Sequence, residues 1–401
     1  EPFTPQAAKA AFDRTLFEIG GGVSALAQYV ESIEATGDSL IFRLKSAYAP
    51  LTTDLAGPSG MIASPAQVQK LGKDLGQHPV CVGPYEFASR TSGSEIVLKA
   101  SSHYHDPSAV HFDQISFRIV TDENARLLGI RSGDLDIIEN PPITELGRLE
   151  SEGLKITKFI GLGWTGLNIN VGNTDGAGKP PVVREHPVSK HPEIREAISL
   201  ALDRNALNAL LSRGQSNAGC SVISPSDPMY SEVPCPGRDV EAAKALIAGT
   251  GVALPIGMTV IANRDVRALE AIQAMVKEIG IEITIDACDT STCFNRFTKG
   301  EADAYFTTWS GLPDVDTLMS ALFGASSALN GTQPLDPRID ELLKAGRVEN
   351  DPAARKAIYA EFAERLASEK VAVSIGNPAV AVVSGAKLGG IGFSAPGKLD
   401  V

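Results

Sequence analysis

The stretch from Gly257 to Trp309 constrains the fold most strongly, because strand and helix patterns alternate along it. Apolar strands are predicted at 257–263, 281–287 and 302–309, and helices at 265–280 and 292–300. A β-α-β-α-β order is typical of a mostly parallel sheet with helices on its faces. We therefore predict an α/β protein.

The remaining segments add further elements around this unit. Alternating apolar residues indicate half-buried strands at 39–45, 94–101 and 112–120, and helical spacing predicts helices at 192–214, 239–249 and in 336–370. Asp122 is placed to cap a helix that Gly133 closes before a strand at 135–138. At 401 residues the chain is too long for one ordinary core, so we expect two or three domains.

Charge and hydrophobicity exclude some functions. The net charge of −12 argues against a nucleic-acid partner, which requires clustered lysines and arginines. No segment approaches the roughly 18 consecutive apolar residues of a membrane span. The opening "EPFTPQAAKAAFDRTL" reads like the middle of a protein, so we expect a processed or partial chain.

The five cysteines include two local pairs. Cys288 and Cys293 flank a polar turn, and Cys220 and Cys235 end a Pro- and Ser-rich loop. Neither pair forms C-x-x-C or has a histidine at metal-site spacing. We predict a disulfide in each pair, which implies an oxidising, extracytoplasmic compartment; the alternative is free thiols in a cytosolic protein. Cys81 is left over and is predicted to be a packed small residue.

The segment Gly161-Leu-Gly163-Trp-Thr-Gly166 matches the G-x-G-x-x-G pattern of dinucleotide-binding proteins. That function requires a helix to begin at the last glycines, so that its N-terminal amides face the phosphates. The following "LNINV" alternates like a strand instead. We interpret the glycines as a joint between two β segments, at a hinge or cleft edge, and keep a nucleotide-dependent oxidoreductase as the rival.

Other catalytic or metal signals are weak. His103 and His105 would share one face of a strand and could bind zinc, but a solvated strand end is favoured. The chain has no G-x-S-x-G element, and no spacing singles out an acid–base pair of carboxylates. We therefore predict no enzyme activity, no cofactor and no metal.

Trp309 and the turn after it are the strongest candidate for a binding site. In open α/β sheets, ligands meet residues just beyond the carboxyl ends of the strands, where Trp309, Ser310 and Gly311 are expected. A tryptophan followed by a polar turn suits the wall of a small-molecule cleft. The alternative is a core tryptophan, with Asp316 capping the next helix.

Several motifs, in order, resemble one known family. They are "EPFTPQAAKAAFDRTL", "VGPYEF" at 82–87, "SSHYHDPSAVHFDQISFRIVTDENARLLGIRSGDLDII" at 101–138, "LNIN" with "PEIREAISLALDRNAL", and "TTWSGLPDVDTLM" at 307–319. Together they resemble the extracytoplasmic solute-binding proteins of ABC importers, family 5, the peptide/nickel-type group that includes dipeptide- and oligopeptide-binding proteins.

The resemblance implies a periplasmic-binding-protein-like, two-lobed clamp of class II type, with an extra α+β domain whose N-terminal part is missing before Glu1. Its parts would be the remaining extra domain at 1–77, lobe I at 78–160, lobe II at 161–375 and the return of lobe I at 376–401. The crossings would be hinges containing Gly161, Gly163 and Gly376, because glycine accepts φ of either sign.

The resemblance also implies a binding site. Its expected residues are Trp309, Ser310, Gly311, Leu312, Asp314, Trp164, Thr165 and Asn168. Peptide binders of the family place an aspartate three residues after the tryptophan, where it holds the ligand's α-ammonium, and this chain has Leu312 there. Either Asp314 serves instead, or the ligand carries no free α-ammonium. A charged hydrogen bond of this kind contributes roughly 1.5–3 kcal/mol.

The expected function is non-catalytic capture of a peptide or peptide-like solute for delivery to the permease of an ABC transporter. The protein would be a monomer outside the cytoplasm, lipid-anchored in its full-length form. Alternatives on the same fold are a binding protein for glycosides or metal complexes and a sensory receptor.

Overall fold

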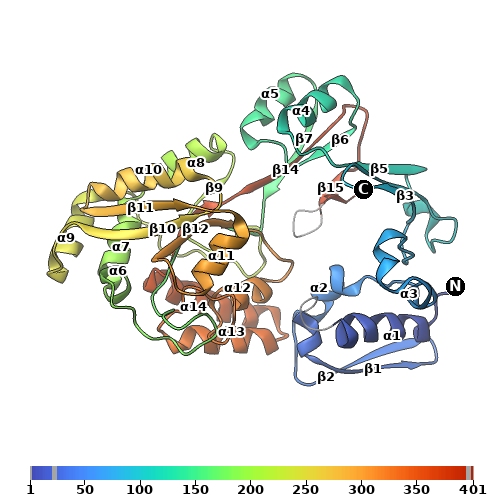
Figure 1. Cartoon of the computed structure of the whole chain (residues 1–401), viewed down its shortest axis with the longest axis horizontal. Coiled ribbons are helices and arrows are strands. Elements are labelled where there is room, and N and C mark those ends of the chain that lie inside the picture. The colour runs from blue at the N-terminus through green and yellow to red at the C-terminus, as the bar shows by residue number, and fades with distance from the viewer. Residues whose placement is uncertain (1, 20–24, 394–398, 401) are drawn as a thin grey trace. The chain divides into compact units, whose positions relative to one another are not determined.

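The structure, a computed structural model, describes residues 2–19, 25–393 and 399–400. The chain forms two compact units, Glu1–Asp136 and Ile137–Asp400 (Figure 1). The finer division into 1–77, 78–160, 161–375 and 376–401 stays a prediction, and residues 1, 20–24, 394–398 and 401 of it lie outside the described residues.

The first unit contains a helix-covered hairpin and a separate three-stranded sheet. Phe12 of α1 packs edge-on against Phe42 of β2, with ring centroids 5.1 Å apart, and buries the inner face of the antiparallel β1–β2 hairpin. The hairpin region comprises α1 (Pro5–Asp13), η1 (Arg14–Glu18), η2 (Ala25–Gln28), β1 (Val30–Thr36), β2 (Ser39–Leu44), α2 (Leu51–Leu55), η3 (Pro58–Gly60), α3 (Pro65–Leu71) and η4 (Gly72–Gln77).

The three-stranded sheet is antiparallel in the order β3-β4-β5. The Asp122 side chain accepts a hydrogen bond from Ala125 N at 2.7 Å, and Gly133 ends the helix with φ of +80°, which confirms both predicted signals for α4. The elements here are β3 (Tyr85–Thr91), β4 (Glu95–Ala100), η5 (Pro107–Ala109), β5 (Gln114–Arg118) and α4 (Glu123–Ser132).

The second unit contains a six-stranded sheet in the order β11-β10-β12-β8-β13-β9. The predicted β-α-β-α-β run forms one side of it: β10 (Ile256–Ala262) lies between β11 (Ile281–Ala287) and β12 (Ala304–Trp309) and is parallel to both. Next to β12, the antiparallel strands β8 (Trp164–Ile169) and β13 (Ala372–Asn377) continue the sheet. The sheet is therefore mixed rather than wholly parallel.

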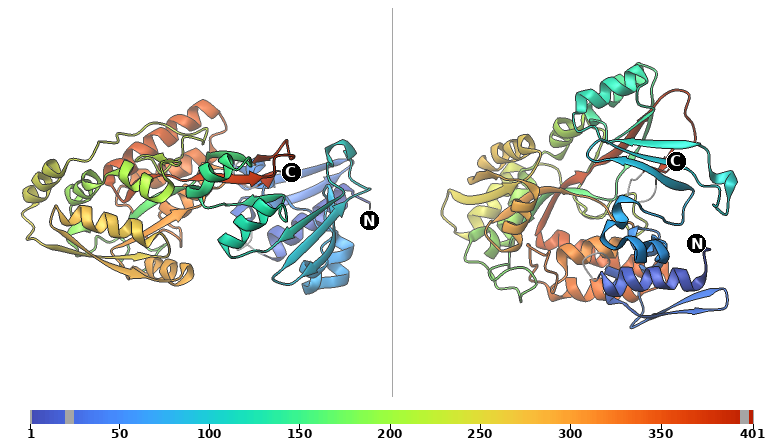
Figure 2. Two further views of the ribbon diagram at one scale, coloured as in Figure 1. Left: turned by 90° about the horizontal axis from the view of Figure 1, so that it is seen from above. Right: turned by 45° about the vertical axis from the view of Figure 1, so that its right-hand side comes forward.

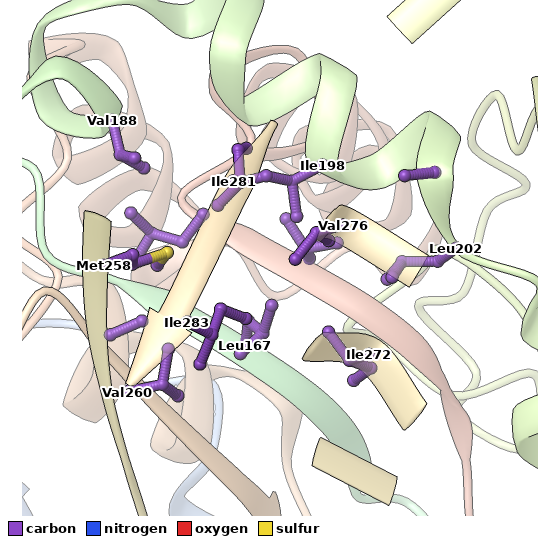
Figure 3. Close-up of a cluster of buried hydrophobic side chains, with 14 of the residues drawn as sticks. Leu167, Val188, Ile198, Leu202, Met258, Val260, Ile272, Val276, Ile281 and Ile283 are labelled. Atoms are coloured by element: carbon purple, nitrogen blue, oxygen red, sulfur yellow. The ribbon is translucent and has the colours of Figure 1, made fainter. Parts of the chain in front are cut away.

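Helices cover both faces of this sheet (Figure 2). One face packs on α7 (Pro192–Ala201), α8 (Arg204–Ser212), α9 (Val240–Thr250) and α10 (Val266–Lys277), as Figure 3 shows for Leu167, Ile198 and Ile272. The other packs on α12 (Val315–Phe323), α13 (Pro337–Val348) and α14 (Pro352–Glu369). Residues of β8 and β13 alternate between these two cores, as a period of two requires. Ile261 of β10 and Tyr305 of β12, which face away from the first core, belong to a smaller cluster with α11 (Thr290–Thr298).

A second sheet of this unit has the order β6-β14-β7. Two chain segments connect it to the larger sheet: residues 161–163 join β7 (Lys155–Ile160) to β8, and Pro378 joins β13 to β14 (Ala379–Ser384) (Figure 1). The segments are neighbours, because Gly161 N–H donates to Pro378 O at 2.9 Å and the Asn377 amide donates to Gly163 O at 3.0 Å. The prediction from the sequence that these glycines connect two β segments is therefore confirmed.

The remaining elements of this unit are short, apart from α11. They are β6 (Ile137–Glu139), η6 (Ile143–Glu145), α5 (Leu146–Ser151), α6 (Pro187–Lys190), β9 (Asn217–Ala218), α11 (Thr290–Thr298), β15 (Gly392–Phe393) and β16 (Leu399–Asp400). Among the described helices, none is both long and apolar enough to cross a membrane.

Candidate functional site

Trp309 is the last residue of β12 and lies opposite Trp164 of the antiparallel β8. Its indole N–H donates to Asn168 Oδ1 at 3.0 Å. The rings of Phe294 and Tyr305 stand edge-on to it, with centroids 6.0 and 5.9 Å away. The indole is partly buried and oriented by one hydrogen bond and two rings, which leaves part of its surface for other contacts.

Asn168 is buried, with 1% of its surface exposed, and both ends of its amide are used. Its nitrogen donates to Tyr305 O at 3.1 Å, while its oxygen accepts from Trp309. Strand alternation explains the arrangement, because Asn168, Tyr305 and Trp309 project from the same face of the β8–β12 pair. Asn168 therefore positions the indole, and its burial leaves almost no surface for the predicted direct contact with a solute.

Trp164 lies in the core of the second unit, whereas the resemblance implies that it contributes to the binding site. Its side chain has no exposed surface and belongs to the core that α12, α13, α14 and residues of the 220–235 loop form. Its indole N–H has no hydrogen-bond partner among the described residues. In this structure part of the Trp309 side chain is therefore accessible, whereas the Trp164 side chain is not. Thr165 is also buried, and its hydroxyl is 2.9 Å from that of Thr308.

The turn after Trp309 is open at first and buried at its end. Ser310 is exposed, Leu312 is 37% exposed, and Asp314 is buried. The Asp314 carboxylate accepts from Arg355 Nη1 and Nη2 at 2.8 and 2.7 Å. Burial by itself would lower the pKa of Arg355, but the hydrogen-bonded carboxylate of Asp314 offsets this and the net pKa is raised. Asp314 is thus engaged within the protein and not free to hold an α-ammonium.

The predicted cap of the next helix is wrong by two residues. Asp314 is the N-cap of α12 and accepts from Asp316 N at 2.8 Å. Asp316 is instead buried inside the first turn, where its carboxylate accepts from Arg347 at 2.9 Å and from the Tyr359 hydroxyl at 3.1 Å. Burial and the nearby Asp316 carboxylate raise the pKa of Tyr359. The sequence near the helix does not decide which of these two aspartates is the N-cap, because the choice depends on ion pairs with Arg347 and Arg355, which lie far along the chain.

The glycines of the crossing segments are required by close packing. A Cβ at Gly163 would lie 2.0 Å from Trp309 O, and one at Gly376 would lie 2.0 Å from Asn217 O, where φ is also +148°. Gly161 would meet the Val380 side chain at 2.8 Å. Gly166 lies inside β8, so no helix begins there. The rival dinucleotide-binding prediction therefore lacks the helix N-terminus on which it depends.

Both predicted cysteine pairs are bonded in the structure, Cys220 to Cys235 and Cys288 to Cys293. Cys81 is exposed, contrary to its predicted packing, because it lies on an isolated bridge with Ala63 between two irregular segments. Within the described ranges, no group of three or more His, Cys, Asp or Glu side chains is arranged to hold a metal ion.

A mixed sheet with helices on both faces, joined to a second sheet by two adjacent segments, defines the class of two-lobed periplasmic binding proteins. The chain belongs to the bacterial extracellular solute-binding proteins, family 5, whose middle-region model matches residues 1–330. This match confirms the family resemblance of the sequence motifs.

Individual relatives are distant. The glutathione-binding protein GsiB of Shigella dysenteriae is 24% identical over 345 residues, which cover 82% of this chain and 64% of that protein. The chain thus spans less than two thirds of the length of the curated relatives it matches. Among solved structures, DppA of Helicobacter pylori in complex with the peptide STSA gives a TM-score of 0.78 at 21% identity, covering 97% of this chain and 78% of that one. NikA of Brucella suis in complex with Fe(III)-EDTA gives 0.81 at 21% identity, covering 98% and 82%.

Proposed function

We propose that the chain captures a small solute, peptide-like in chemistry and without a required free α-ammonium, and that it acts outside the cytoplasm as the binding component of an ABC importer. Trp309 is the observation that carries this proposal. It ends β12 at the carboxyl edge of the sheet, where ligands of open α/β sheets bind, and its indole is held in place but only partly covered.

The turn after Trp309 indicates the chemical class of the solute. Leu312 provides exposed apolar surface at the position where the resemblance places an ammonium-binding aspartate, and Asp314 is paired with Arg355. A buried ammonium without a partner would cost more than it gains. Acylated peptides and other neutral small organic molecules fit this surface better than peptides with a free amine.

No covalent chemistry is part of the proposal. Family membership supports delivery to a membrane permease, and the predicted monomeric state and lipid tether agree with such a carrier. The two disulfides support an oxidising compartment. Relatives in complex with a peptide and relatives in complex with a metal chelate share the fold, so the class of solute has to be measured.

A thermal-shift screen tests the proposal, with di- to tetrapeptides in free and N-acetylated forms, glycosides and metal complexes. A solute at 100 times its Kd should raise the free energy of unfolding by roughly 2.7 kcal/mol. We expect acetylated peptides to match or exceed their free counterparts. If no class shifts the transition, or only metal complexes do, the proposed solute class is wrong.

Trp309→Ala should weaken binding of the best solute by about 2 kcal/mol or more, because it removes the aromatic wall of the site. Titration calorimetry measures the loss. Leu254→Ala, at a residue that is 56% exposed, is the control and should bind as the parent does. Equal affinity of Trp309→Ala and the parent would exclude Trp309 from the site.

Leu312→Asp should improve the affinity for free-amine peptides relative to acetylated ones, because it places a carboxylate on the exposed turn. The expected gain is about 1.5–3 kcal/mol, the value of a charged hydrogen bond. Paired titrations of each peptide in its two forms measure it. Strong binding of free-amine peptides by the parent, with no change in Leu312→Asp, would contradict the role assigned to this position.

A further inference from the structure

We propose that the Cys288–Cys293 disulfide is a positioning brace for Trp309: it holds the start of α11 on the sheet edge, so that Phe294 stays against the indole. The inference deepens the proposed function and rests on it, since that function makes Trp309 the wall of the solute site. The cysteines act through Phe294 and the helix rather than by touching the solute.

The disulfide joins the end of a strand to the first turns of a helix. Cys288 directly follows β11, and its N–H donates to Ala262 O, at the end of β10, at 3.1 Å. Cys293 lies in α11 and is completely buried. Asp289 between them caps α11 by accepting from Thr292 N at 3.0 Å. The covalent bond therefore fixes where α11 starts relative to the carboxyl edge of the sheet.

Helix α11 contributes one aromatic neighbour of Trp309 and contacts the other. Phe294 of α11 is one of them, with a centroid distance of 6.0 Å. The other, Tyr305, is itself contacted by Phe297 of α11 at 5.5 Å. Cys288, Cys293 and these four aromatic residues belong to one apolar cluster. A displacement of α11 would consequently change the packing around the indole from two sides.

The C-terminal end of α11 has its own polar attachments: the Asn173 amide donates to Phe297 O and Thr298 O at 3.1 Å, and Ala177 N–H donates to Thr298 O at 2.7 Å. The remaining polar attachments of α11 are weaker. The Asn263 amide donates to Thr290 Oγ1 at 3.0 Å, and Arg296 pairs with Asp286 at 2.8 Å on a partly exposed surface. Exposed ion pairs contribute little, and a helix of nine residues is marginal in isolation. Apart from its burial in the cluster, the first turn of α11 thus depends mainly on the disulfide.

Acrylamide quenching of tryptophan fluorescence tests the brace without any solute. The chain has two tryptophans and Trp164 is fully buried, so quenching reports mainly Trp309, and a Trp309→Phe version of each variant provides the background. Cys288→Ser/Cys293→Ser should raise the quenching constant roughly twofold at temperatures far below its Tm, because the local structure becomes more mobile. The matched control is Cys220→Ser/Cys235→Ser, which removes the disulfide outside α11. Because the 220–235 loop packs on Trp164, the Trp309→Phe background is subtracted first, and the remaining Trp309 component should stay near its parent value.

The same variants are then titrated with N-acetylated Met-Leu and with S-methylglutathione as probes, because a free thiol would exchange with the disulfides. The Cys288/Cys293 variant should bind the better probe roughly tenfold more weakly, because a loosened wall is no longer preorganised. If neither probe binds the parent, the proposed solute class is wrong. The quenching experiment then still tests whether the Cys288–Cys293 disulfide positions Trp309. Unchanged quenching, or an equal rise in the control, overturns the brace. If the serine variant unfolds, Cys288→Ala/Cys293→Val keeps the site apolar and takes its place, with the same outcomes.

Discussion

Replacing Arg355 by Met is expected to lower the free energy of unfolding by about 3–5 kcal/mol, because it leaves the Asp314 carboxylate buried without its partner. Asp314 is 7% exposed and takes both of its Arg355 hydrogen bonds at 2.8 Å or less. The expected decrease in stability is the cost of leaving a buried charge without its ionic partner, and not the net contribution of the ion pair. Urea unfolding at neutral pH measures it.

A double-mutant cycle separates these two quantities. Asp314→Asn keeps the N-cap of α12 and removes the charge, so Asp314→Asn/Arg355→Met should recover most of the loss. The control is Arg338→Met: Arg338 pairs with Glu361 on the exposed surface, and its loss should change stability by less than about 1 kcal/mol. A single Arg355 variant as stable as this control would show that the buried pair does not hold the turn after Trp309.

Gly163→Ala is expected to destabilise the chain by about 3 kcal/mol, because the new Cβ would lie 2.0 Å from Trp309 O and the two backbones would have to separate. The damage falls where the crossing segment passes the site, so solute affinity should fall together with stability. Thermal unfolding and titration with the best solute measure the two effects.

Gly237→Ala is the matched control for this substitution. Gly237 is exposed, and a Cβ added there would meet no atom within 4 Å beyond its own chain neighbours. The control should differ from the parent by less than about 1 kcal/mol. If Gly163→Ala is as harmless as Gly237→Ala, the crossing segments are not closely packed and their glycines have another role.

Local signals in the sequence predict much of the fold. The β-α-β-α-β run, the cap Asp122 and the strand pattern after Gly166 all depend on residues near one another in the chain, and the structure contains each of them. The position of the candidate site follows from the same kind of signal, since a tryptophan at the end of a predicted strand marks the carboxyl edge of the sheet.

The contacts that decide the site are long-range and could not be predicted. Arg355 lies on α14 and pairs with Asp314 from 41 residues away, and nothing in the sequence around Arg355 indicates a partner. Phe294 looks like any apolar residue of a short helix until α11 is placed against Trp309. The burial of Trp164 likewise depends on the 220–235 loop and three later helices.

The central claim is that a solute binds at Trp309 and is released unchanged. Calorimetric titration of the chain with the best solute of the screen, followed by mass spectrometry of the solute after its release, tests this most directly. We predict one solute per chain, a released mass identical to that added, and affinity lost in Trp309→Ala. A solute recovered with an altered mass, or bound equally well without Trp309, would contradict the account.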